Sequence, residues 1–118
     1  MTSIVEQLAI WAKNNSQILR SRGVKVIDRF PQKGSSDSWK GSVSLAYNEI
    51  LISYTVWERS GLQTELIIMN ALTRKTIEMV DKNPEAPWIV HADLDRVVTK
   101  LLGNAYREME SNPKLIIT

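Results

Sequence analysis

The stretch EILISYTVWE, residues 49–58, decides the fold of this chain. Its residues fall into two alternating sets: Ile50, Ile52, Tyr54 and Val56 in one, and Leu51, Ser53, Thr55 and Trp57 in the other. Alternation with a period of two is typical of a β-strand that buries one face. We therefore expect a strand here, with the first set turned towards a core.

The run Trp39–Tyr47 alternates in the same way just before this strand. Asn48-Glu49 between the two runs predicts a two-residue hairpin turn, because asparagine tolerates the positive φ that such turns need. The turn would set Leu45 opposite Ile52, so the apolar residues of both strands would share one face.

Two later turns extend the predicted sheet as far as Val80. Residues 59–61 suit a hairpin loop with Gly61 at a left-handed position, and residues 71–74 suit another turn. The pairs that these turns predict are Tyr54 with Leu66, Ile52 with Ile68, Ile68 with Ile77, and Leu66 with Met79. Three turns interpreted separately thus agree on one buried side.

A helix is predicted before the sheet, over residues 4–22. Ser3 and Glu6 match a capping box at its start. Apolar residues follow at helical spacing, and Gly23 suits the cap at its end. Residues 24–30 then predict a further strand.

A second helix is predicted after the sheet, from Asp93 as N-cap to about Met109. Its apolar residues keep a 3.6-residue period that continues past Gly103. Residues 88–90 before it are either a short extra strand or an anchor, and the Gly- and Ser-containing residues 31–38 predict a flexible loop. The fold class expected for residues 1–118 is therefore one α+β domain, with an N-terminal helix, an antiparallel meander of four to five strands, and a C-terminal helix packed on one face.

Composition limits the class of protein. With 43% apolar and 24% charged residues, the 118-residue chain is ordinary for a globular domain. No apolar run approaches the roughly 20 residues that span a bilayer, and no secretion signal is recognised, so we expect a cytoplasmic protein with no membrane partner. The absence of cysteine excludes disulfides, thiolate zinc sites and thiol catalysis.

No motif for catalysis or cofactor binding stands out. His91 is the single histidine, and Asp93 and Asp95 near it suit the start of a helix, where the dipole favours acids. Gly34 and Gly41 lack the spacing of a Walker loop or a dinucleotide fingerprint. We expect neither an enzyme nor a bound cofactor or metal.

The first third of the chain is its most basic part, although the formal net charge is only +2. The basic residues concerned are Lys13, Arg20, Arg22, Lys25, Arg29, Lys33 and Lys40. They form either a solvated surface or a phosphate-binding strip. The second alternative would make the chain a small nucleic-acid-binding module.

The second face of the predicted sheet is mixed in character. Its polar members are Ser42, Ser44, Ser53, Thr55, Gln63 and Glu65, and its apolar members are Leu51, Trp57, Ile67 and Met69. An apolar group of this kind either packs under a loop or terminal segment, or binds a partner.

Several short phrases resemble the TriTu-type immunity proteins of bacterial polymorphic toxin systems. The phrase YTVWERSG, residues 54–61, is similar to that family's strand ending in Trp-Glu and a glycine turn. The other matching phrases are, in order, Leu8–Trp11, Gly23–Val26, Ser42–Leu45, Leu66–Met69 and Leu94–Leu102. The likeness covers roughly residues 4–102. Arg74 stands where a turn glycine is expected, and residues 104–118 are an addition.

The resemblance implies an immunity protein that binds a cognate toxin domain, often a nuclease, and neutralises it without catalysis. Acidic residues such as Glu65 could meet a basic toxin cleft, and a homo-oligomer stays open. We expect the partner to bind the second sheet face and the neighbouring loop, at Asp37, Trp39, Thr55, Trp57, Arg59, Gln63 and Glu65. Tryptophan and arginine are typical interface anchors, so Trp57 and Arg59 are the central candidates.

Overall fold

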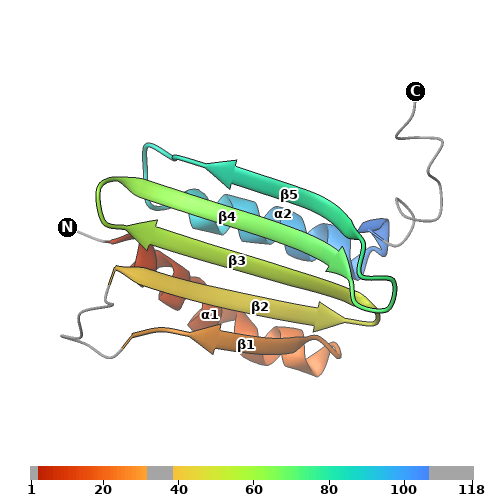
Figure 1. Cartoon of the computed structure of the whole chain (residues 1–118). Coiled ribbons are helices and arrows are strands. Elements are labelled where there is room, and N and C mark those ends of the chain that lie inside the picture. Colours follow the sequence, from red (N-terminus) through yellow and green to blue (C-terminus); the bar gives the residue numbers. More distant parts are fainter. Residues whose placement is uncertain (1–2, 32–38, 107–118) are drawn as a thin grey trace.

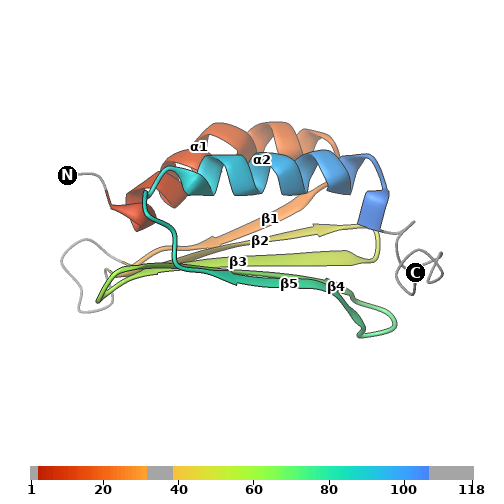
Figure 2. The same cartoon turned by 90° about the horizontal axis from the view of Figure 1, so that it is seen from above.

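The computed structural model describes residues 3–31 and 39–106. Its elements are α1 (Ile4–Ser21), β1 (Lys25–Arg29), β2 (Lys40–Tyr47), β3 (Ile50–Glu58), β4 (Leu62–Asn70), β5 (Thr76–Lys82) and α2 (Ile89–Leu102). The strands form one antiparallel sheet in chain order, and both helices lie on the same side of it (Figure 1, Figure 2). The predicted α+β class is confirmed. We call the helix-covered side of the sheet inner and the opposite side outer.

Helix α1 begins and ends as its sequence predicts. The Ser3 hydroxyl accepts a hydrogen bond from the Glu6 backbone N–H at 3.0 Å. At the other end Gly23 has φ +88°, and the Val24 N–H donates to the Leu19 carbonyl at 3.0 Å. This hydrogen bond closes a loop of six residues, Leu19 to Val24, with the left-handed Gly23 inside it. It is the Schellman motif, which ends the helix and directs the chain into β1.

The central strands have the predicted register. Leu45 lies opposite Ile52, and Ile52 lies opposite Ile68. The turns between these strands place Asn48 at φ 55° and Gly61 at φ 137°. The positive φ values agree with the residue types that predicted both turns.

The predicted register of β5 is wrong by one position. The predicted pairs were Ile68 with Ile77 and Leu66 with Met79, whereas Ile68 faces Glu78 and Leu66 faces Val80. A bulge between Ile68 and Met69 shifts the pairing, so one residue of β5 is extra. Because side chains alternate, this shift turns Met79 to the outer side, where 58% of it is exposed.

The connection from β4 to β5 is organised by the buried Asn70. Its side-chain oxygen accepts hydrogen bonds from the N–H groups of Leu72 and Thr73 at 2.8 and 3.0 Å. Its carbonyl accepts from Arg74, which has φ 61°. The left-handed position where the sequence suggested a glycine is therefore held by an arginine.

Helix α2 begins earlier than predicted. It starts at Ile89, with Trp88 in the N-cap position and no side-chain capping bond, so the predicted N-cap role of Asp93 is wrong. Residues 89 and 90 belong to the helix rather than to a short strand. Trp88 is 68% exposed and is no buried anchor.

Helix α2 also ends earlier than predicted. The last residue of α2 is Leu102, and Asn104 takes a left-handed conformation with φ 60°, so α2 does not run through Gly103; residues 105 and 106 are helical again after this break. The chain nevertheless returns to the core, because Tyr106 is buried. The predicted end near Met109 lies outside the described residues.

The core lies between the inner side of the sheet and the two helices. Its most completely buried side chains include Leu8, Trp11, Ile52, Tyr54, Ile68 and Leu94. Within the part of the chain described, neither helix is long and apolar enough to cross a membrane.

Two hydrogen bonds join the helices to each other. Trp11 Nε1 donates to Asp95 Oδ1 at 3.0 Å, and His91 Nε2 lies 2.7 Å from Gln7 Oε1. Both pairs are separated by 84 residues, so the helices run side by side in the same direction, as Figure 1 shows. His91 thus contributes to helix packing.

Candidate binding face

The outer side of the sheet is open: over residues 3–31 and 39–106, no helix or second sheet lies on it (Figure 2). Cross-strand partners share a face, so its side chains form four rows across the strands. The rows are Lys25, Ala46, Leu51, Met69 and Thr76; Ile27, Ser44, Ser53, Ile67 and Met79; Arg29, Ser42, Thr55, Glu65 and Asp81; and Lys40, Trp57 and Gln63. We call these residues the outer face.

An apolar patch occupies one half of the outer face. Ile27, Leu51 and Met79 are 43%, 40% and 58% exposed. Ile67 and Met69 are half-buried between them, since Ile67 pairs with Met79 and Met69 with Leu51. The open side of an antiparallel sheet is normally polar. Such an exposed apolar patch therefore indicates a surface that binds another molecule.

Charges on the outer face are separated by sign. Lys25 and Arg29 lie on β1, whereas Glu65 on β4 and Asp81 on β5 are direct cross-strand partners. Like charges set opposite each other destabilise a sheet. The ion pair that the structure shows among the described residues joins Lys82 to Asp93, so neither outer-face acid has a counter-charge there. A cation from outside would relieve this repulsion.

Four of the predicted partner-binding residues lie together on the outer face. Thr55 is paired directly with Glu65, and Trp57 with Gln63, in adjacent rows of β3 and β4. All four side chains are partly or fully exposed. Their role in binding stays a prediction, but the structure brings them into one continuous group.

The two aromatic candidates lie at the same end of the sheet, and each is held by a cation. Lys40 Nζ lies 5.7 Å from the Trp57 ring centroid, and Arg59 Cζ lies 5.1 Å from that of Trp39. Both distances allow cation–π attraction. Each tryptophan ring of this end therefore lies beside a basic side chain. Asp37, the remaining predicted residue, lies outside the described residues.

An open depression of about 600 Å³ joins Trp39 to the outer face. Its lining residues are Arg29, Phe30, Pro31, Trp39, Lys40, Gly41, Ser42 and Thr55. Among the described residues that line it, the charged ones, Arg29 and Lys40, are basic. The predicted surface therefore continues from the acidic pair on β4 and β5 to a basic, aromatic end beside β1.

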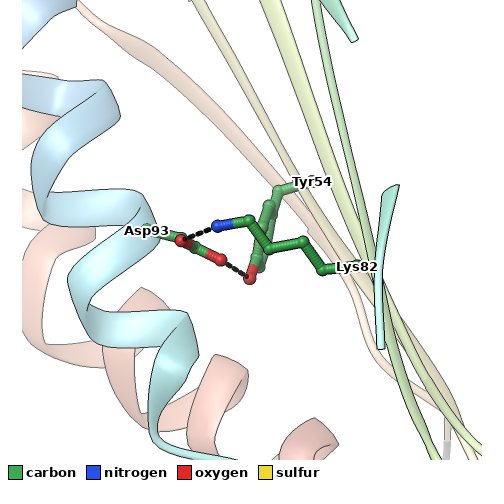
Figure 3. Close-up of polar contacts among 3 residues, drawn as sticks. All are labelled: Tyr54, Lys82 and Asp93. Carbon is green, nitrogen blue, oxygen red and sulfur yellow. Dashed lines mark hydrogen bonds and ion pairs between the residues drawn. The ribbon is translucent and has the colours of Figure 1, made fainter. Parts of the chain in front are cut away.

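A polar cluster on the inner side was missed at the level of sequence; Tyr54 and Asp93 are buried in it, whereas the Lys82 side chain is 40% exposed (Figure 3). The Tyr54 hydroxyl donates to Asp93 Oδ2 at 2.9 Å, and Lys82 Nζ lies 3.0 Å from Asp93 Oδ1. Burial raises the pKa of Tyr54 far above its usual range, and the charge and hydrogen bond of Asp93 raise that pKa further. Tyr54 is therefore a hydrogen-bond donor at physiological pH.

This cluster joins three elements, β3, β5 and α2, and leaves no room for a substrate. The space beside it is too narrow to admit even a water molecule. The sequence held a signal for it, because Asp93 falls on the same helical stripe as Val90, Leu94 and Val97, which are buried. An aspartate on a buried stripe needs partners that compensate its desolvation.

The described residues contain no group of three or more His, Asp or Glu side chains that could hold a metal ion. The chain matches no protein-family model, no curated protein and no solved structure. The likeness to TriTu-type immunity proteins therefore rests on the phrases of the sequence alone.

Proposed function

We propose that this chain is an immunity protein, a cytoplasmic and non-enzymatic inhibitor that binds a cognate bacterial toxin domain of the nuclease type. The observation that carries the proposal is the outer face, where an exposed apolar patch adjoins two acidic side chains that form no ion pair with any described residue. The phrases shared with TriTu-type immunity proteins supply the class of partner.

The chemistry of a nuclease suits this face. A cleft that binds nucleic acid is rich in lysine and arginine, and such cations would relieve the repulsion between Glu65 and Asp81. The apolar patch would supply the water-free centre of the interface, with Trp57 as an anchor at its edge. The sheet holds these groups before the partner arrives, so little ordering is needed on binding.

The alternative of a nucleic-acid-binding module uses the basic residues of the first third. Those residues are divided between two layers: Lys13 lies on α1, whereas Lys25 and Arg29 lie on β1 at the edge of the outer face. Arg20 also donates to the Val26 carbonyl at 3.1 Å. Basic residues that are divided between two layers form a poorer phosphate-binding surface than basic residues gathered on one face. A gel shift at low salt tests this alternative, since true phosphate binding falls steeply as salt rises.

The test of the proposal is binding of the toxin domain encoded beside this chain, measured by calorimetry with the Trp57→Ala variant. Loss of a hot-spot tryptophan weakens binding by about 30-fold or more, equal to about 2 kcal/mol. Trp88→Ala is the matched control, because Trp88 is exposed at the start of α2, away from the outer face. Unchanged affinity of Trp57→Ala, with unchanged thermal unfolding, would remove the outer face from the proposal.

A further inference from the structure

The outer face is patterned about its middle strand. Strand β3 is the third of five, and the row through Thr55 changes from Arg29 at the β1 edge to Asp81 at the β5 edge. The row through Ser53 has an apolar residue at both edges, Ile27 and Met79. Opposite charges and matching apolar groups thus lie at equal distances from β3.

We infer that two copies of this chain pack outer face against outer face, about a twofold axis that runs along β3. Such an axis places β1 of one copy over β5 of the other and keeps each row over itself. Arg29 then meets Asp81 of the second copy, twice in each dimer, and Ile27 meets Met79. Leu51 and Trp57, both on β3, meet their own counterparts near the axis.

The charges select this arrangement over the other twofold packing of two faces. An axis across the strands would set β1 over β1, so Lys25 and Arg29 of both copies would meet one another. Like charges in contact across an interface disfavour association. The axis along β3 instead gives the pair Glu65 and Asp81 a counter-charge that residues 3–31 and 39–106 of their own chain do not provide.

The geometry is that of an aligned β-sandwich. Two sheets stacked face to face lie about 10 Å apart, with mean strand directions within roughly 30° of each other, and an axis along β3 satisfies this. Five strands about 4.8 Å apart, with about eight residues each at roughly 3.3 Å per residue, give a face of about 600 Å². Two faces bury about 1,200 Å², the lower end for a specific interface. A reversible dimer is therefore expected.

The dimer does not rest on the proposed function, because it involves this chain alone. Sedimentation velocity of the purified chain over a concentration series is the test, and a monomer–dimer equilibrium is expected. Arg29→Glu and Asp81→Lys each set like charges together in both symmetric contacts, so each should weaken the dimer about tenfold. A mixture of the two variants should regain the wild-type association, because the reversed and the original pair then form in one heterodimer.

The mixture separates a specific contact from general damage, since misfolded chains do not restore each other. Glu85→Lys is the control for net charge: Glu85 is exposed between β5 and α2 and should leave association unchanged. A chain that is monomeric at every concentration overturns the inference. So does a dimer that both single variants leave intact, or a mixture that stays monomeric.

Discussion

The hydroxyl of Tyr54 determines how α2 fits on the sheet. It reaches from β3 to Asp93, whose second oxygen is bound by Lys82 of β5. A buried carboxylate without partners is strongly unfavourable, so α2 can lie only where both partners reach Asp93. The cluster thus contributes mainly to the position of the helix, while the apolar core contributes most of the stability.

Tyr54→Phe is expected to lower the free energy of unfolding by about 1.5–3 kcal/mol, the range for a hydrogen bond to a charged group. The ring still fills its place in the core, so the loss reports the hydroxyl and not a cavity. Urea unfolding followed by tryptophan fluorescence measures the difference.

Tyr106→Phe is the matched control for this change. Tyr106 is equally buried, and burial raises its pKa to about 12 with a contribution from Glu78, but its hydroxyl makes no hydrogen bond to the described residues. Its loss should change stability by less than about 0.5 kcal/mol. Equal effects of the two substitutions would contradict the role given to Asp93.

At the scale of elements, the pairing register could be predicted for the strands that tight turns connect, β2, β3 and β4. Asn48 and Gly61 are residue types that indicate turn positions with positive φ. Together with the alternation of apolar and polar residues in β2, β3 and β4, they determine how these strands pair. Residues 71–74 contain no asparagine or glycine that would indicate a left-handed turn position. The bulge beside Ile68 also has no recognisable signal in the sequence, so the register of β5 could not be predicted. A local signal sets a short turn, whereas a bulge depends on how the whole strand packs.

The candidate surface could be predicted where it lies on the central strands, but not where it lies on β5. Thr55, Trp57, Gln63 and Glu65 follow from the register of the central strands. The shifted register of β5 hid Asp81, because a slip of one residue exchanges the two faces of a strand. The acidic pair, and with it the separation of charge across the outer face, was therefore visible only in the structure.

Arg74 gives a prediction for the β4–β5 connection. Its φ of 61° is unfavourable for a side chain with a Cβ atom and neutral for glycine. Arg74→Gly should therefore be more stable to urea unfolding than Arg74→Ala by about 1 kcal/mol. Both variants lack the arginine side chain, so their difference isolates the backbone. An alanine variant as stable as the glycine variant would show that the connection relaxes to a different conformation.

At the scale of the whole molecule, both helices of the described part of the chain pack on one side of the sheet. Both helices cover the inner side, so the outer face must serve any partner that binds the sheet surface. The proposed toxin and the inferred second copy would use the same acidic pair and the same apolar patch. They should therefore exclude each other.

Mutual exclusion predicts how the toxin domain acts on the dimer. A partner that binds only the monomer must compete with dimer formation. Its apparent affinity therefore falls as the concentration of this chain rises. Sedimentation of a fluorescent toxin domain, titrated at several chain concentrations, measures this fall. The complex should contain one copy of each protein.

The variants separate the two uses of the face. Arg29→Glu should shift the concentration dependence to about tenfold higher chain concentrations, because the dimer is weakened while Glu65 and Asp81 remain for the toxin. Glu65→Lys should weaken the toxin complex itself, by about tenfold at an interface charge. A toxin complex that retains two copies of this chain would contradict the shared face, since both partners would then be bound at once. The dimer could still be correct in that case, and the toxin would have to bind the helix layer or an edge of the sheet.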